Sequence, residues 1–437
     1  MTKTNNFHIH TSMGQIPKNI IFVIPDGAGP SLYAAYRQYK NQGYAAFMNR
    51  IIMDDYLLGQ VSTSPKNDSS KTFITVTDSA AAGTAFATGQ KTYTSAISMD
   101  HKGNPIKNMA EYAKEVNKKV GIVVTADVAH ATPAVFYAHA TNRNEKAHIA
   151  DQLLDHPASN GELKVDILMG AGTPYFKRQD RNLIQEIQQK GYIFVDNKHD
   201  LLTSKESKIL GLFADYFLPK YWDMPETIPT LAEMTHCALE RLSTHEEGFF
   251  LMVEASQIDR AAHLNSIASA MSEMEDYEAA WNVAIDFAKR NGETLVIAAS
   301  DHDTGGFSVA SKGQETFDVN PLLQMHASPE KIAQELIIHQ DDEAILKKYI
   351  DWDLTPIEIA TLSNSRGGMF ADPYKETLSN LIQFINWRTN SGWTSFNHTG
   401  GDVNLYAYGP GWENFLGFHQ NSDIGQTLIN LIQNKKA

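Results

Sequence analysis

The sequence predicts an α/β fold in which a largely parallel, doubly wound central sheet is flanked by helices. Apolar, β-rich runs recur along the 437 residues, and several segments between them have helical periodicity. Strands that alternate with helices of this length form parallel sheets, because each helix returns the chain to the starting edge of the sheet. Hydrophobic residues make up 42% of the chain, so it can bury a substantial core.

Strands are expected where a short apolar run is rich in β-branched or aromatic residues, as in Ile-Ile-Phe-Val-Ile at 20–24. Further runs of this kind lie at 120–125, 165–169, 249–253, 294–299 and 403–408. Helices are expected between them at 106–117, 182–190, 231–242 and 269–290. Open α/β sheets bind ligands beyond the carboxyl ends of their strands, so functional residues are expected in the loops that follow these runs.

The segment 307–397 breaks the alternation of strands and helices. It is charged, it has no obvious central strand, and its patterns favour helices at 330–339, 342–351, 356–362 and 373–389. We interpret residues 1–437 as a single α/β domain with a helical insertion at 307–397 that covers the strand edge as a lid or serves assembly. A peripheral subdomain without a catalytic role fits the same pattern.

Composition excludes several classes of function. The net charge of −14 argues against a general nucleic-acid or anionic-membrane surface, which requires a basic face. No apolar stretch approaches the ~20 residues of a transmembrane helix, and no signal peptide is visible, since residues 1–17 lack an apolar core. Cys237 is the only cysteine, so the chain has no internal disulfide. An anionic protein that acts on an anionic substrate needs local positive charge, which bound metal ions would supply.

Asp301 and His302 lie in the motif Ser-Asp-His-Asp-Thr-Gly-Gly, directly after the expected strand 294–299. This places two metal-competent side chains at the carboxyl edge of the sheet, where the glycines allow a tight turn and a close approach. Asp26, followed by Gly27, ends the first strand in the same way. Each motif alone is also typical of an ordinary turn.

Asp78 and Ser79 stand before an alanine-rich segment, so Asp78 is expected to be an N-cap and Ser79 to open a helix. There the helix amides and dipole would favour negative charge that develops on the serine. A plain capped helix start fits equally.

Two further loops carry candidate ligands. His130-Ala131-Thr132-Pro133 follows the strand at 120–125, with Arg143 further on. Glu254 follows the strand at 249–253, and Asp259 and His263 are four residues apart, so on a helix they share one face. His398 precedes the last expected strand. Mixed histidine and carboxylate ligands suit zinc and oxygen ligands suit magnesium; two ions about 4 Å apart would stabilise both oxygens of an in-line displacement at phosphorus.

With these motifs in this order, the sequence resembles the alkaline phosphatase family from about residue 19 to 434, most weakly at 307–397. The run Ala-Tyr-Gly-Pro-Gly at 407–411 also matches the family. The resemblance implies an alkaline-phosphatase-like fold, hydrolysis of phosphate monoesters with broad specificity, binding of inorganic phosphate, a homodimer, and a periplasmic or secreted location.

The resemblance also implies a role for each matching residue. Ser79 would be the nucleophile that becomes phosphoserine. One Zn²⁺ would activate the hydrolytic water and stabilise the departing alkoxide, and a second Zn²⁺ would lower the pKa of the serine. One Mg²⁺ would complete the site, and Arg143 would bind two phosphoryl oxygens in a bidentate contact. The implied ligands are Asp259, His263 and His398 for the first zinc, Asp26, Asp301 and His302 for the second, and Asp26, Thr132 and Glu254 for magnesium.

Two positions depart from part of the family. Relatives have Asp or His at the position of His130, and a histidine there is therefore expected to bias the third site between magnesium and zinc. Relatives have Lys, His or Trp at the position of Arg260. A guanidinium there is expected to bind phosphate directly or through water, which predicts tighter phosphate binding and slower product release.

Other functions are weighed against this one. A phosphodiesterase or nucleotide pyrophosphatase of the same superfamily typically lacks the magnesium site and the arginine, whereas Glu254, Thr132 and Arg143 are present here. A sulfatase nucleophile requires a Cys-x-Pro-x-Arg pattern, and the segment from Cys237 to Arg241 lacks the proline. A non-catalytic phosphate- or metal-binding relative would be expected to lack the nucleophile or a ligand.

Overall fold

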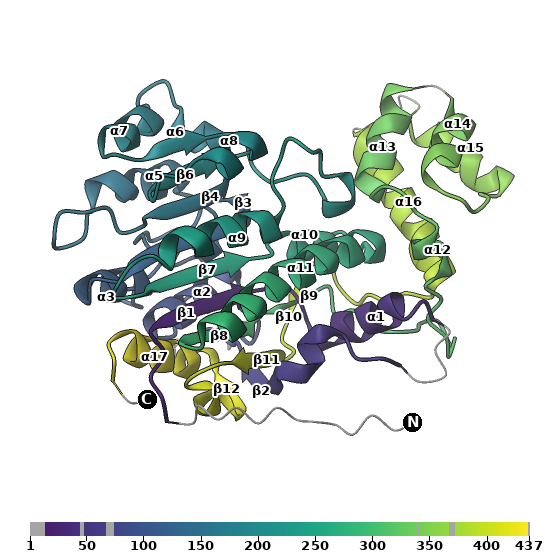
Figure 1. The fold of residues 1–437 in the computed structure, drawn as a ribbon. Helices are drawn as coiled ribbons and strands as arrows, with labels where there is room; N and C mark the ends of the chain where they lie inside the picture. Colours follow the sequence, from purple (N-terminus) through teal and green to yellow (C-terminus); the bar gives the residue numbers. More distant parts are fainter. Residues whose placement is uncertain (1–13, 44–47, 67–73, 340, 367–371, 436–437) are drawn as a thin grey trace.

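A ten-stranded sheet forms the centre of the molecule, with helices on both faces (Figure 1). The computed structural model describes residues 14–43, 48–66, 74–339, 341–366 and 372–435. The strand order is β12-β2-β11-β8-β1-β7-β3-β4-β6-β5, and β11 alone runs antiparallel to its neighbours in this described sheet. The strands are β1 (Asn19–Ile24), β2 (Leu57–Ser62), β3 (Lys119–Asp127), β4 (Ile167–Ala171), β5 (Ile193–Val195), β6 (Ile209–Leu212), β7 (Phe249–Glu254), β8 (Thr294–Ala299), β11 (Val403–Tyr408) and β12 (Gly417–Gln420).

Helices cover the two faces of this sheet with separate apolar cores. In β1, Ile21 and Val23 point into one core and Ile20, Phe22 and Ile24 into the other, which explains why its sequence is apolar throughout. The first core is completed by α1 (Pro30–Lys40), α9 (Leu231–Leu242) and α11 (Ile267–Asn291). The second contains α2 (Ser79–Thr88), α3 (Met109–Glu115), α5 (Lys146–Asp155), α7 (Leu183–Gln189) and α17 (Asn421–Ile432).

Short helices connect the strands at the edges of the sheet. They are α4 (Ala131–Ala134), α6 (Thr173–Phe176), α8 (Lys198–Thr203) and α10 (Gln257–His263), with 3₁₀ helices at Ile52–Tyr56, Tyr221–Asp223 and Trp412–Phe415. A two-stranded sheet pairs β9 (Asp303–Thr304) with β10 (His398–Thr399) in antiparallel register. None of the helices in the described residues is both long and apolar enough to span a membrane.

The segment 307–397 is helical in its described residues and contributes no strand to the large sheet. Its helices α13, α14 and α15 stand at one end of the molecule, and α16 runs from them toward the sheet (Figure 1). The bounds are α12 (Asn320–Leu323), α13 (Pro329–Ile338), α14 (Asp342–Tyr349), α15 (Pro356–Ser365) and α16 (Pro373–Thr389).

The predicted α/β fold with a largely parallel sheet is confirmed, and one detail of the strand assignment is wrong. The run 403–408 forms β11, the antiparallel strand, but it is not the last strand, because β12 follows it. Strands β2, β5, β6 and β12 were not expected from the sequence. β5, β6 and β12 are three or four residues long, and β2 is half exposed, so neither a long apolar run nor full burial marks them.

Candidate active site

Four adjacent strands in the centre of the sheet deliver most of the candidate residues to one edge. In the order β8-β1-β7-β3, Asp301 and His302 follow β8, Asp26 follows β1, Glu254 ends β7, and Thr132 lies in α4 after β3. All four strands are parallel, so their carboxyl ends meet at this edge. The side chains of Asp26, Glu254, Asp301 and His302 are fully buried there.

A glycine turn after β1 holds Asp26 against the neighbouring loops. Gly27 has a φ of +75°, and a Cβ atom at this position would lie 2.7 Å from the Cα of Asp259. The amide of Gly27 donates to Oδ1 of Asp301 at 3.3 Å, and its carbonyl accepts from the amide of Thr304 at 3.2 Å. Glycine is required here because any side chain would push the helix that carries Asp259 out of the site.

Ser79 is the first residue of α2, and Asp78 caps this helix by accepting from the amide of Ala81 at 3.0 Å. The predicted cap and helix start are therefore present. The Ser79 side chain is 2% exposed, and its hydroxyl oxygen lies 3.1 Å from Nε2 of His302. Nε2 of His302 also lies 3.3 Å from Oδ2 of Asp301 and 3.6 Å from Oδ1 of Asp26. The serine thus borders the carboxylate and imidazole cluster.

Asp259, His263 and His398 form a second cluster beside the first. Asp259 and His263 share one face of α10, and Oδ1 of Asp259 lies 3.4 Å from Nε2 of His263 and 3.5 Å from Nε2 of His398. The rings of His302 and His398 stack with centroids 3.6 Å apart. Asp259 also groups with Asp26 and His302, since one ligand atom from each of the three lies within 4.8 Å of the others. The two clusters therefore adjoin.

Asp26, His130 and Glu254 form a third group of potential ligands, again with atoms within 4.8 Å of one another. Both carboxylate oxygens of Asp26 and of Glu254, and the hydroxyl oxygen of Thr132, are buried without a hydrogen-bond partner in the described residues. Buried polar atoms in native proteins almost always have partners. Buried oxygen atoms without hydrogen-bond partners are suitable ligands for a hard cation such as magnesium.

The hydrogen bonds of His263 and His398 leave one nitrogen of each ring free to bind a cation. Nδ1 of His263 lies 2.6 Å from the carbonyl oxygen of Phe396, and Nδ1 of His398 lies 2.9 Å from that of Thr77. A carbonyl only accepts, so the hydrogen-bond network assigns the proton of each neutral ring to Nδ1. Their Nε2 lone pairs then face each other at 3.1 Å, beside the carboxylate of Asp259. A positive ion between these atoms removes the repulsion, as in zinc sites where each histidine donates its other N–H to an oxygen.

The electrostatics of the cluster agree with this arrangement. Burial raises the pKa of Glu254 to about 8. Burial and the neighbouring Asp301 raise the pKa of Asp26, and burial raises that of Asp301. Burial and His398 lower the pKa of His302. Carboxyl groups packed together in this way ionise readily only when a cation balances their charge, so the residue set fits bound metal ions.

Arg143 reaches the same edge of the sheet from the loop after α4. Its Nη1 lies 3.2 Å from Oδ2 of Asp78, the residue that caps the helix of Ser79, and its Nη2 lies 3.4 Å from Nε2 of His130. The amide of Arg143 donates to the carbonyl of Ser95 at 2.9 Å. The guanidinium is therefore placed beside the start of α2.

Arg260 lies on α10 with an exposed side chain, and its guanidinium stacks on Phe217 at 3.7 Å from the ring centre. Phe217 also packs edge-on against His130. Arg260 belongs to none of the three ligand groups, so it stands at their margin. Cys237 is 2% exposed in α9, where burial raises its pKa to about 11, which fits a structural residue and not a nucleophile.

Sequence reasoning missed residues that hold the cluster in place. The hydroxyl of Thr304 donates to Oδ1 of Asp259 at 2.6 Å and lies 3.2 Å from Nδ1 of His302. It can accept the Nδ1 proton of His302, which leaves Nε2 facing Ser79. Thr304 lies in the recognised 300–306 motif, but only the fold brings it to Asp259. The contact of Asp78 with Arg143 was missed for the same reason.

Comparison with known proteins agrees with this geometry. A family model described as alkaline phosphatase matches residues 17–434. The chain is 43% identical to alkaline phosphatase 3 of Bacillus subtilis (strain 168) over 422 residues, which cover 95% of this chain and 89% of that protein. It is 32% identical to the alkaline phosphatase of Schizosaccharomyces pombe, with 97% of this chain and 83% of that protein covered.

Solved structures lead to the same family. A cold-active alkaline phosphatase from the psychrophile Shewanella sp. superimposes with a TM-score of 0.87 at 33% identity, covering 95% of this chain and 99% of that one. The Thermus thermophilus alkaline phosphatase gives a TM-score of 0.81 at 29% identity, covering 98% and 93%. The chain belongs to the alkaline phosphatase family and is a phosphoric monoester hydrolase.

Proposed function

We propose that the protein hydrolyses phosphate monoesters through a phosphoserine intermediate on Ser79, with two zinc ions and one magnesium ion in the adjoining clusters. The observation that carries this proposal is the contact between the Ser79 hydroxyl and Nε2 of His302, in a cluster that also contains Asp26 and Asp301. A serine hydroxyl is a weak nucleophile at neutral pH, and metal coordination is one way to activate it.

The protein's own residues would position the phosphoryl group. The oxygen of Ser79 attacks phosphorus while the alkoxide of the ester leaves on the opposite side, and water then releases phosphate from the serine. The N-terminus of α2, a ten-residue helix, favours negative charge beside Ser79. Arg143, held by Asp78, binds two phosphoryl oxygens in a fork. These roles require positioning and charge neutralisation, which dominate phosphoryl transfer.

The candidate ligands would form three metal sites. Asp259, His263 and His398 would hold the first zinc, and Asp26, Asp301 and His302 the second. Asp26, Thr132 and Glu254 would hold magnesium. When bound, the ions would lower the pKa of the serine and of a water molecule and neutralise charge that develops at phosphorus. Support comes from the facing Nε2 atoms of the first site and the unpartnered oxygens of the second and third.

The third site combines magnesium ligands with His130, which groups with Asp26 and Glu254. Burial and the charge of Arg143 lower the pKa of this imidazole, so it is neutral and able to coordinate a metal. A histidine-to-glutamate variant of TAB5 alkaline phosphatase, at 26% identity and a TM-score of 0.67, has magnesium bound in its M3 site. We propose that His130 shifts the preference of this third site toward zinc.

Assays with two esters test the function directly. Turnover of p-nitrophenyl phosphate and of its bis ester would be measured before and after chelation and after addition of zinc and magnesium. Monoester turnover that chelation abolishes and both metals restore supports the proposal. Faster turnover of the bis ester would identify a phosphodiesterase, and metal binding without turnover of either ester a binding protein.

The helical insertion at 307–397, the oligomeric state and the location of the protein are further parts of the proposed function. We propose that the chain is one domain with 307–397 as an insertion within it, and that it works as a homodimer in a periplasmic or secreted location. Light scattering of the full chain would measure its mass in solution. A monomer at micromolar concentration would contradict the dimer.

A further inference from the structure

A cavity of about 350 Å³ lies beside the His263 cluster, between the end of α10, helix α16 and the segments 311–312 and 391–396. We propose that this cavity binds the leaving group of the substrate, and that this group is uncharged and rich in hydroxyls, as in a sugar phosphate. This rests on the proposed function. The residues that would bind the phosphoryl group do not select a leaving group, and the cavity would do so.

The cavity and the candidate active site share a wall. Phe396, which lines the cavity, accepts the Nδ1 proton of His263 through its carbonyl oxygen at 2.6 Å. Leu264 and Asn265, which also line it, directly follow His263 at the end of α10. His398 lies two residues beyond Phe396. On this proposal, a group attached to a phosphoryl oxygen near His263 and His398 extends past this wall into the cavity.

The wall chemistry favours neutral hydroxyl groups. Trp393 and Phe396 supply aromatic surface, Gln383 and Asn386 supply amides, and no carboxylate is among the described residues that line it. Gln383 and Phe396 are exposed at this lining. A hydroxyl group both donates and accepts, so a sugar can pair with the amide of Gln383 while its C–H face packs on the ring of Phe396.

Lys312 is the only cationic residue among the described residues that line the cavity, and it contacts an aromatic ring. Nζ of Lys312 lies 4.0 Å from the ring centre of Trp387, an exposed residue of α16 outside the cavity wall. Lys312 is exposed, and one exposed ammonium is a weak site for a second phosphate or a carboxylate on the leaving group. The lining therefore favours an uncharged occupant.

The aromatic wall is held rigidly against the catalytic loop. A Cβ atom at Gly305 would lie 2.6 Å from Cε3 of Trp393, and Gly305 has a φ of +78°, so only glycine allows the indole to lie there. Phe307 packs edge-on against Trp393 with ring centres 4.8 Å apart. Gly305 thus admits this ring, which packs directly against the loop that carries Asp301 and His302.

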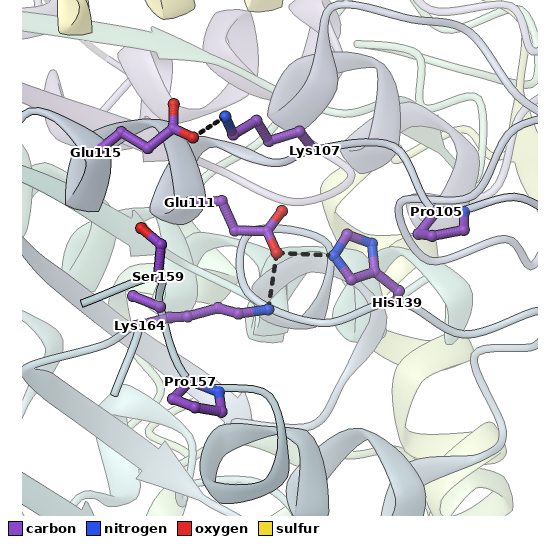
Figure 2. Close-up of a pocket in the computed structure, with 9 residues that line it drawn as sticks. Pro105, Lys107, Glu111, Glu115, His139, Pro157, Ser159 and Lys164 are labelled. Atoms are coloured by element: carbon purple, nitrogen blue, oxygen red, sulfur yellow. Dashed lines mark hydrogen bonds and ion pairs between the residues drawn. The ribbon is translucent and has the colours of Figure 1, made fainter. Parts of the chain in front are cut away.

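A larger cavity of about 420 Å³ does not compete for this role. Figure 2 shows the carboxylate of Glu111 between His139 and Lys164, and Lys107 paired with Glu115. The charged groups that line it are thus paired with one another. None of its lining residues belongs to the three ligand groups.

Narrowing the cavity tests the inference. Ser379 lies on α16, lines the cavity and is exposed, so Ser379→Trp should fill the space without contact to the metal ligands. Lys375→Trp is the matched control, because Lys375 lies one turn earlier on α16, has an 81% exposed side chain and does not line the cavity. The measurement is kcat/KM for glucose 6-phosphate and for methyl phosphate, whose leaving group is too small to occupy the cavity.

We expect Ser379→Trp to lower the ratio of kcat/KM for glucose 6-phosphate over methyl phosphate by about tenfold, the loss typical of a few missing contacts. Lys375→Trp should leave the ratio unchanged. Gln383→Trp, on the same wall, gives a second measurement if the first variant does not fold. An unchanged ratio in both cavity variants, with both esters hydrolysed, overturns the inference alone. A wild-type protein that hydrolyses neither ester overturns the proposed function instead.

Discussion

The hydroxyl oxygen of Ser79 lies 3.1 Å from Nε2 of His302, although the two residues are 223 positions apart in the chain. The same nitrogen faces carboxylate oxygens of Asp301 and Asp26 at 3.3 and 3.6 Å. Because burial and His398 lower the pKa of His302, it presents a neutral lone pair and not a charge to this group. A hydroxyl, an imidazole and two carboxylates around one point are typical of a set of metal ligands. They do not form the Ser-His-Asp arrangement of a serine protease.

Ser79→Ala should reduce monoester turnover by on the order of a thousandfold or more, because the covalent step loses its nucleophile. The variant should keep its metal content, since Asp26, Asp301 and His302 remain. Steady-state kinetics and elemental analysis measure the two properties. Labelled phosphate that still becomes attached to the variant protein during turnover would remove Ser79 from the mechanism.

Arg143→Lys should weaken inhibition by inorganic phosphate by roughly tenfold, because lysine keeps the charge but loses the two-pronged contact. Asp78→Asn should have a smaller effect in the same direction, since Asp78 orients the guanidinium from 3.2 Å. The inhibition constant of phosphate at fixed pH provides the measurement. Equal constants for the wild type and Arg143→Lys would show that the fork is not used.

Arg260→Trp should weaken phosphate inhibition and raise kcat if product release limits turnover, because the guanidinium no longer contributes positive charge at the margin of the site. Phe217→Leu should act in the same direction, since Arg260 stacks on this ring at 3.7 Å. Phosphate inhibition constants for the two variants and the wild type decide this. Unchanged inhibition in Arg260→Trp would contradict a role for Arg260 in phosphate binding.

Thr304→Val should lower the affinity for zinc about 10- to 100-fold, because it removes the hydroxyl that contacts both Asp259 and His302. Thr361→Val is a suitable control, since that hydroxyl only donates to the carbonyl of Ile357 on an exposed helix. Metal affinity is measured by competition with a chelator, independently of activity. Equal affinities in the wild type and Thr304→Val would mean that the hydroxyl does not orient the ligands.

The sequence alone could predict the central strands because their physical signal is local. Strands such as β1 and β7 are buried on both faces and therefore read as unbroken apolar runs. The half-exposed β2 has no such run, and its place between β11 and β12 depends on contacts between distant segments. The direction of β11 was equally invisible, because an apolar run does not record whether its neighbour is parallel.

In the candidate site, too, the residues with a local signal could be predicted and the long-range contacts could not. Asp26 and Asp301 were predicted from their positions at strand ends, and parallel topology then brings such ends together. The contact between Thr304 and Asp259, and the cavity beside Phe396, depend on where α10 and the 391–396 segment meet. The sequence of neither segment predicts this contact, because the contact depends on how both segments pack against the rest of the fold.

Glu111→Gln should destabilise the protein at neutral pH by about 1–3 kcal/mol, because it leaves the buried Lys164 without its charged partner. Oε1 of Glu111 lies 2.9 Å from Nζ of Lys164 and 3.1 Å from Nε2 of His139, and Oε2 accepts from the amide of Asn108 at 3.0 Å at the start of α3 (Figure 2). Glu115→Gln is the control, since its exposed pair with Lys107 should contribute at most about 1 kcal/mol.

The effect of Glu111 should depend on pH in a defined direction. Burial raises the pKa of Glu111, but the hydrogen bond from His139 and the charge of Lys164 outweigh burial and lower the pKa from 4.5 to about 2. A carboxyl group with a lowered pKa stabilises the fold above its unfolded pKa, and this stabilisation is lost as the pH falls toward the folded pKa. The difference in melting temperature between metal-free wild type and Glu111→Gln should therefore be fully present at about pH 5.5. It should shrink between pH 4.5 and pH 2. A difference that stays constant over that lower range would show that Glu111 stabilises the fold through packing and helix capping and not through its charge.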